Sequence, residues 1–146
     1  MTTCKDIMTP DPRWCSPYDT IQRVAQMMAV ENVGMIPVVD SEGSKKLVGV
    51  ITDRDIALKV VGEGKDGIVT KVESIMTRDP VACGPDDDIQ KALSAMAEHQ
   101  IRRIPVVRND GELAGIIAQA DIAIRREQPD ETAEVVEKIS KPAGDA

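Results

Sequence analysis

One short motif, Thr52-Asp53-Arg54-Asp55, has the residue types and spacing best suited to chemistry in this sequence. The carboxylate of Asp55 can accept two charge-assisted hydrogen bonds at once, which suits a ligand that offers two donors. Arg54 can bind phosphate through two N–H groups. If the motif begins a helix, the first turn adds backbone N–H groups and positive potential. The same spacing fits a capping box, with Thr52 as N-cap and Asp55 at N3, so ligand binding and local capping are both open.

A second copy of the motif keeps the acid and loses its neighbours. It reads Ala118-Gln119-Ala120-Asp121, so Asp121 corresponds to Asp55, while alanines replace the threonine and the arginine. A capping box does not explain an acid that has lost its hydroxyl partner, which favours ligand contact. A favourable charge in the first helical turn is the alternative for Asp121.

The other reactive residue types do not indicate an enzyme. The only histidine, His99, has no cysteine, serine or aspartate context that suggests a catalytic triad. The three cysteines are scattered and form no CxxC pair, so we expect reduced thiols and no metal site. Cys15 and Cys83 occupy equivalent places, either as small apolar strand residues or as a redox pair. Cys4, near a flexible terminus, is expected to be the more reactive thiol.

An internal repeat organises the chain. Residues 7–43 align without gaps onto residues 75–111, with almost half of the positions identical. The longest shared run is Ile-Pro-Val-Val, at 36–39 and 104–107. After a two-residue deletion, the Gly49 and Gly115 regions also align. The sequence is therefore a tandem of two related units.

Each unit predicts a short strand, a helix, two strands and a second helix, giving an α/β (α+β) fold. The first helices begin near Asp19 and Asp87, as N-cap or first-turn residues. Their apolar spacing predicts these buried residues: Ile21, Val24, Ala25 and Met28 in one unit, and Ile89, Ala92, Leu93 and Met96 in the other. The strands after each helix (36–39 with 47–51, and 104–107 with 113–117) predict hairpins, followed by helices over 53–61 and 119–126.

The repeat also sets the expected boundaries. The first unit covers 5–62, a linker covers 63–73, the second unit covers 74–126, and a tail with a short helix covers 127–146. A 15.8-kDa chain can bury a core of its own.

Composition excludes several classes of partner. The net charge is −7, which disfavours nucleic acid and anionic membranes, and the sequence has no Phe, one Trp and one Tyr for base stacking. No apolar run approaches the ~20 residues of a membrane span, and the first residues lack a signal peptide's apolar stretch. We therefore expect a cytoplasmic protein.

The duplicated Ile-Pro-Val-Val runs and the motifs that begin at Gly49 and Gly115 resemble a pair of cystathionine-β-synthase (CBS) domains, known as a Bateman module. The resemblance covers about residues 5–126. Met1–Met8 and Glu98–Arg103 also resemble small stand-alone bacterial CBS pairs such as the hypoxic response proteins of mycobacteria.

That resemblance implies two clefts between units that pack about a pseudo-two-fold axis, each binding an adenosine-containing ligand. The aspartate would accept the ribose hydroxyls, the threonine would reach phosphate or ribose, and backbone before the proline would read adenine. The first cleft would combine Thr52, Arg54 and Asp55 with Arg102, Arg103 and Ile104. The second would combine Asp121 with Gly34, Met35 and Ile36. Because of its arginines, the first cleft is expected to prefer phosphorylated ligands.

The function implied is a nucleotide-sensing regulatory module. Its ligands would be AMP, ADP or ATP, with NAD and S-adenosylmethionine as further candidates, and no cofactor would be required. We expect a homodimer whose output acts in trans through an unknown protein partner. The alternative is a ligand-independent dimeric adaptor.

Overall fold

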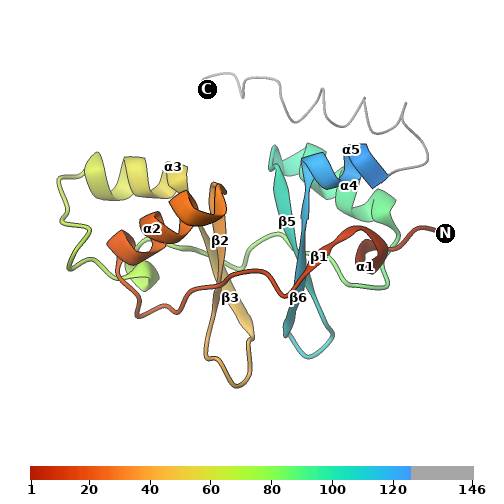
Figure 1. The fold of residues 1–146 in the computed structure, drawn as a ribbon, viewed down its shortest axis with the longest axis horizontal. Helices are drawn as coiled ribbons and strands as arrows, with labels where there is room; N and C mark the ends of the chain where they lie inside the picture. Colours follow the sequence, from red (N-terminus) through yellow and green to blue (C-terminus); the bar gives the residue numbers. More distant parts are fainter. Residues whose placement is uncertain (126–146) are drawn as a thin grey trace. The chain divides into compact units, whose positions relative to one another are not determined.

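The computed structural model describes residues 1–125 and divides the chain into two compact units. The central unit is the continuous stretch Arg13–Pro80. The terminal unit joins Met1–Pro12 to the described residues from Val81 onward. Each unit has one three-stranded antiparallel sheet with helices against it, as expected for an α+β fold (Figure 1).

The central unit has the sheet order β2-β3-β4. Its elements are α2 (Ile21–Glu31), β2 (Met35–Val39), β3 (Leu47–Thr52), α3 (Asp53–Ile56), the π-helical turn η1 (Ala57–Val61), the 3-10 helix η2 (Val72–Ser74) and β4 (Thr77–Arg78). Helix α2 packs on β2, and α3 continues directly from β3 into η1.

The terminal unit has the sheet order β1-β6-β5. Its elements are α1 (Cys4–Ile7), β1 (Thr9–Pro10), α4 (Ile89–His99), β5 (Arg103–Val107), β6 (Leu113–Ala118) and α5 (Gln119–Arg125). Helix α4 packs on β5, and α1 contacts both α4 and β6. The tail helix expected near 130–140 lies outside the described residues, and no helix within residues 1–125 is long and apolar enough to cross a membrane.

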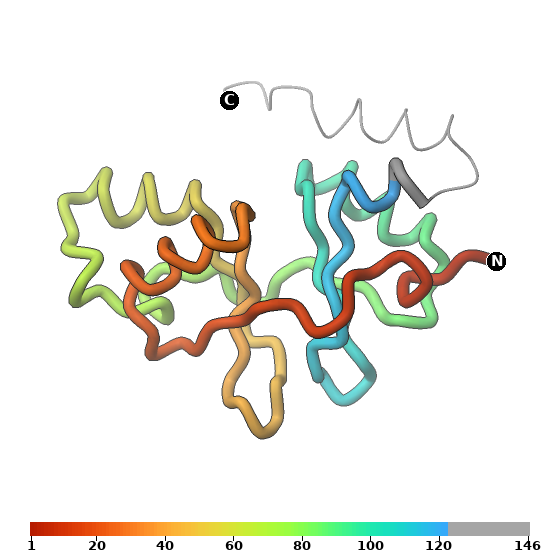
Figure 2. Tube along the Cα trace, viewed as in Figure 1, coloured from red at the N-terminus to blue at the C-terminus, as the bar shows by residue number. Residues whose placement is uncertain are grey.

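The leading segment of each repeat belongs to the compact unit that holds the other repeat's hairpin. Strand β1 pairs with β6, where Thr9 lies opposite Ile116, and β4 pairs with β3, where Thr77 lies opposite Val50. Figure 2 shows the first segment running from the terminal unit into the central one. The boundaries expected at 5–62 and 74–126 follow the sequence repeat, whereas the compact units follow these strand pairings.

Both predicted hairpins are confirmed. Ile36 lies opposite Ile51, and Ile104 lies opposite Ile117, in matching antiparallel registers. The register of both hairpins shifts at equivalent residues. The shift lies between Val38 and Val39 in the first hairpin and between Val106 and Val107 in the second. A shift of this kind increases the local strand twist.

The helix caps lie one residue later than predicted. The N-cap of α2 is Thr20, and that of α4 is Asp88, whose side chain accepts from the backbone N–H of Gln90. Asp19 and Asp87 instead accept from backbone N–H groups of residues 16 and 84, at 2.8 and 2.7 Å. They close the loop before each helix because a carboxylate can bond a backbone donor three residues earlier as readily as a helical one.

Each unit buries its own core. In α4 the predicted Ile89, Ala92, Leu93 and Met96 are all buried. In α2 Ile21, Val24 and Met28 are buried as predicted and Met27 is buried with them, whereas the prediction is wrong for Ala25, which is exposed. The larger apolar side chain determines which edge of the helix is covered, since burying Met27 removes more apolar surface from water than burying Ala25.

Candidate functional site

The first corner between a strand and a helix lies where β3 ends and α3 begins. The hydroxyl oxygen of Thr52 accepts from the Asp55 backbone N–H at 3.0 Å, and Oδ2 of Asp55 accepts from the Thr52 backbone N–H at 3.1 Å. This is a complete capping box. The capping alternative is therefore confirmed as local structure, and Asp55 keeps one carboxylate oxygen outside that exchange.

The second carboxylate oxygen of Asp55 faces Lys59. The Lys59 ammonium group lies 3.2 Å from Oδ1 of Asp55 and donates to the backbone oxygen of Ile75 at 3.3 Å. The Asp55 side chain is 14% exposed, so the charge is partly shielded and compensated within the unit. No feature of the sequence motif indicated Lys59. Its position one helical turn after the acid could have done so.

The start of β2 lies beside this corner. Met35 lies opposite Thr52 in the sheet, and the Gly34 carbonyl accepts from the Asp53 backbone N–H at 2.9 Å. A Cβ atom at Gly34 would lie 2.9 Å from Oδ2 of Asp53, so the absent side chain leaves room for that carboxylate. The structure thus brings Gly34 and Met35 together with Thr52 and Asp55 inside one unit.

The second corner repeats this arrangement in the terminal unit. Arg103 lies opposite Ala118, and the Arg102 carbonyl accepts from the Gln119 backbone N–H at 2.9 Å. Oδ2 of Asp121 accepts from the Ala118 backbone N–H at 3.3 Å. With Ala118 in place of threonine, the reciprocal hydroxyl bond is missing, and Asp121 makes half of a capping box.

An acceptor atom that the motif did not reveal lies in the second corner. Oε1 of Gln119 is buried and has no hydrogen-bond partner among the residues that the structure describes. Gln119 occupies the position of Asp53 in the first corner. A buried carbonyl oxygen without a donor is energetically unfavourable.

The remaining predicted site residues differ in what they can offer. The side chains of Ile36 and Ile104 are fully buried in the cores, so only their backbone could meet a ligand. The side chains of Arg54 and Arg102 are exposed, and Arg103 is half-buried. Within each unit the acid lies beside the start of that unit's own hairpin. The expected clefts instead pair each acid with the hairpin start of the other unit, and that assignment stays a prediction.

The cysteines depart from expectation. Cys4 is fully buried in the core of the terminal unit, which corrects the expectation that it lies on a flexible terminus. Cys15 and Cys83 are buried at equivalent bridges to Val38 and Val106, as small apolar residues would be. Burial raises the pKa of Cys15 to about 12, so its thiol stays protonated at neutral pH. Within residues 1–125, no three histidine, cysteine or acidic side chains gather as a metal site would require.

The duplicated corners coincide with a known domain. The family model for the CBS domain matches residues 4–62 and again residues 72–126. The chain belongs to the CBS domain family. Each corner lies near the end of its match, where the second hairpin strand meets the final helix of the domain.

Relatives of this CBS pair include small proteins of similar length. The CBS domain-containing protein YhcV of Bacillus subtilis is 39% identical over 140 residues, covering 96% of each chain. Hypoxic response protein 1 of Mycobacterium tuberculosis is 35% identical over 124 residues, covering 84% of each chain. The resemblance to stand-alone bacterial CBS pairs is thereby confirmed.

Two solved CBS structures carry adenosine compounds. The CBS pair of protein MJ0100, in complex with 5-methylthioadenosine and S-adenosyl-L-methionine, is 31% identical with a TM-score of 0.74, covering 85% of this chain and 94% of that one. Protein PAE2072 of Pyrobaculum aerophilum, complexed with AMP, is 26% identical with a TM-score of 0.79, covering 91% and 99%.

Proposed function

We propose that this CBS pair is a regulatory module that binds an adenosine-containing ligand at the two corners, with Asp55 and Asp121 accepting the ribose hydroxyls. The observation that carries the proposal is the acid retained in both corners although only one has a complete capping box. Solved relatives that hold AMP or S-adenosyl-L-methionine support the ligand class.

The first corner suits a phosphorylated ligand. Thr52, Arg54 and Lys59 add a hydroxyl and two cations around Asp55, and cations in that position compensate phosphate charge. A ribose that binds Asp55 replaces the Lys59 ion pair, which frees the ammonium group to approach phosphate. The assignment of Arg102 and Arg103 to this ligand rests on the family resemblance alone, since within their own unit they adjoin the second corner.

The second corner suits a less charged ligand. Ala118 and Ala120 replace the threonine and the arginine, and the buried Gln119 oxygen lacks a donor. An adenine amino group or a ribose hydroxyl supplies such a donor. The corner therefore selects adenosine or an adenosyl thioether over a nucleoside triphosphate.

Ligand-induced stabilisation of the full chain tests the proposal. AMP, ADP, ATP, NAD and S-adenosylmethionine are titrated while the thermal midpoint is followed. A ligand at 100 times its Kd adds about 2.7 kcal/mol, which raises the midpoint by roughly 5–10 °C. In Asp55→Asn the amide oxygen still accepts from the Thr52 N–H while the charge is lost, so the response to AMP should fall sharply with the fold intact.

A matched control comes from the chain itself. Asp6 caps α1 through Thr3 in the same T-x-x-D pattern, with a bond of 2.9 Å from the Thr3 backbone N–H. Asp6→Asn should keep the full response to AMP. Equal losses in Asp6→Asn and Asp55→Asn would assign the effect to capping, and no response to any of the five ligands would refute the proposal.

A dimeric adaptor is the second candidate. The observation that favours it is a set of exposed apolar side chains on the central unit, at Leu58, Val61, Ile68 and Val69. Exposed apolar surface of this kind marks interaction sites. Light scattering of the wild type against Val61→Asp tests it, since a dimer held by this surface dissociates when the charge is introduced. As a ligand-binding module or as an adaptor, the chain would act by binding a partner, and neither proposal includes a catalytic step.

A further inference from the structure

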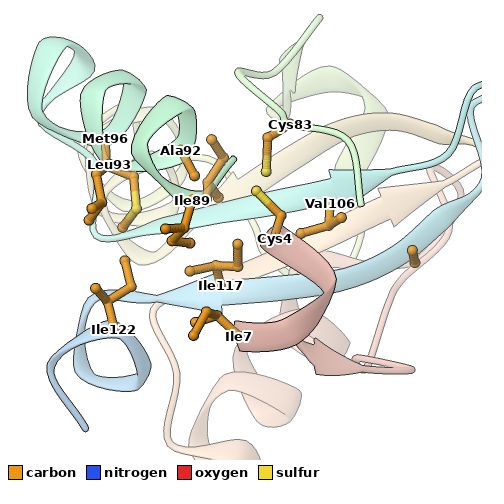
Figure 3. Close-up of a cluster of buried hydrophobic side chains, with 12 residues drawn as sticks. Cys4, Ile7, Cys83, Ile89, Ala92, Leu93, Met96, Val106, Ile117 and Ile122 are labelled. Atoms are coloured by element: carbon orange, nitrogen blue, oxygen red, sulfur yellow. The ribbon is translucent and has the colours of Figure 1, made fainter. Parts of the chain in front are cut away.

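Two cysteines from distant parts of the sequence face each other in the terminal unit. Cys4 begins the short helix α1, and Cys83 lies before α4. Figure 3 shows their sulfur atoms pointing toward one another above the core residues Ile89 and Val106. Both thiols are reduced, and the Cys83 thiol donates to the Pro105 carbonyl at 3.8 Å.

The backbone around this pair is fixed on both sides. The Cys4 N–H donates to the Asp87 carbonyl at 2.9 Å, and the next N–H, of Lys5, donates to the Pro85 carbonyl at 2.9 Å. The Cys83 N–H and carbonyl bond Pro105 and Val107, at 3.0 and 2.8 Å. Cys4 has no exposed surface and Cys83 has 5%. Such anchoring holds the two Cβ atoms in place, a requirement for an unstrained disulfide.

In the central unit, the two positions that correspond to Cys4 and Cys83 hold only one cysteine. In the central unit the corresponding residues are Val72 and Cys15, both buried. The Val72 N–H donates to Asp19 and the next N–H, of Glu73, to Pro17, each at 2.9 Å, which reproduces the anchoring of Cys4. Valine therefore satisfies the packing at this position, and core packing alone does not require the thiol of Cys4.

We propose that Cys4 and Cys83 form a reversible intramolecular disulfide by exchange with a small-molecule disulfide such as oxidised glutathione. One thiolate attacks the oxidant and releases a first small thiol, leaving a mixed disulfide on the protein. The second protein thiol loses its proton, attacks that mixed disulfide and releases a second small thiol. Two S–H bonds and the oxidant's S–S bond are exchanged for one protein S–S bond, and the oxidant takes up both electrons and both protons.

Cys4 is the first nucleophile. The neighbouring Cys83 thiol lowers the pKa of Cys4, while the neighbouring Cys4 and burial raise the pKa of Cys83. Thiolate character governs attack, so Cys4 reacts first and Cys83 resolves. Because Cys4 is buried, the oxidant reaches it when α1 detaches. The four-residue α1 near the chain terminus makes that opening local.

The disulfide would close a loop of about 80 residues that contains the whole central unit. It would also fix the leading segment, with β1, onto the sheet of the terminal unit. A loop of that length restricts the unfolded chain strongly, so oxidation should raise the thermal midpoint by about 10 °C.

Peptide mapping of the oxidised full chain tests the assignment. The protein is incubated with oxidised glutathione below its thermal midpoint, alkylated in denaturant, digested without reduction and analysed by mass spectrometry. We expect a peptide joining Cys4 to Cys83, with Cys15 alkylated. In Cys83→Ala, glutathione should accumulate on Cys4. Cys4→Val copies the residue of the central unit, so it should match the reduced wild type in midpoint and gain nothing on oxidation.

Several results would overturn the proposal. Three alkylated thiols after oxidation up to just below the midpoint would show that the pair does not form a bond. A cross-link that includes Cys15 would assign the wrong partner. Glutathione that remains on Cys4 in the wild type would show that Cys83 cannot resolve it. Cys15→Ala is the matched control, and it should oxidise as the wild type does.

Discussion

The ammonium group of Lys59 lies 3.2 Å from Oδ1 of Asp55, so the acid proposed to bind ribose already has an internal partner. The two residues are one helical turn apart, and Lys59 also holds the Ile75 carbonyl. Ligand binding at this corner is therefore an exchange. The ribose hydroxyls must compete with an ion pair whose lysine is 45% exposed and hence screened by water.

The Lys59→Met variant measures that competition. An exposed pair of this kind contributes at most about 1 kcal/mol, so its removal should strengthen the binding of uncharged adenosine by up to about fivefold. AMP should gain less, because the lysine also approaches its phosphate. Calorimetric titration with both ligands gives the comparison. Weaker adenosine binding in Lys59→Met would show that the lysine supports the ribose contact and does not compete with it.

The two corners allow a reciprocal test of helix capping. Thr52→Ala removes the hydroxyl that accepts from Asp55 and should cost about 1 kcal/mol of unfolding free energy. Ala118→Thr adds the missing hydroxyl beside Asp121 and should gain less than 1 kcal/mol, because Ala118 is buried and its surroundings must accommodate two more atoms. Urea unfolding of both variants gives the values. A loss of stability in Ala118→Thr would show that the second corner has no room for the box.

The hairpins were predictable because they are encoded locally and twice. Continuous apolar runs bounded by turns define the strands, and Asp55 and Asp121 keep one spacing from them. The predicted helix starts were one residue early, because an aspartate can accept from a backbone N–H before a helix as readily as from one inside it. Asp19 and Asp87 both accept from the loop before the helix. The exposure of Ala25 depends on tertiary packing, which the helical period leaves open.

The sequence pattern could not predict that the leading strand of each repeat pairs with the hairpin of the other repeat. Strands β1 and β4 have two residues each, too few for any alternation to show. Their partners are chosen by long-range packing, and Cys4 became buried by the same route. The Lys59 ion pair was missed because the motif ends at Asp55. The exchanged strands and the burial of Cys4 depend on contacts between segments, which local spacing does not record, whereas the i,i+4 spacing of Asp55 and Lys59 could have revealed the ion pair.

The pairing of each leading strand with the other repeat's hairpin explains Gly49 and Gly115, the first residues of the two duplicated motifs. A Cβ atom at Gly49 would lie 2.7 Å from the Thr77 carbonyl oxygen, and one at Gly115 would lie 2.8 Å from that of Thr9. Backbone of the exchanged strand occupies the space in both units. Gly49→Ala and Gly115→Ala should each cost about 1–3 kcal/mol, measured by urea unfolding.

Alkylation of Cys4 and a control variant sharpen that test. Gly115→Ala should loosen β1 and speed the alkylation of Cys4, because both belong to the leading segment. Gly43 has open space around its Cβ position and an ordinary φ, so Gly43→Ala should be neutral or slightly stabilising. Equal losses of unfolding free energy in Gly43→Ala and Gly115→Ala would contradict the explanation that the nearby backbone requires glycine at position 115.

Asp87 should give the terminal unit part of its resistance to acid. The Gly84 backbone N–H donates to its carboxylate at 2.7 Å and holds its pKa below the ordinary value of 3.8, with Lys91 contributing. A pKa lowered in the folded state adds stability above the unfolded value, and that stability is lost as pH falls through the folded value. Asp87→Asn should therefore lower the urea midpoint at pH 7, and the difference from wild type should shrink below about pH 4. Asp86→Asn makes the same change of charge at an exposed neighbour, so a pH-independent or equal loss in both variants would contradict this role.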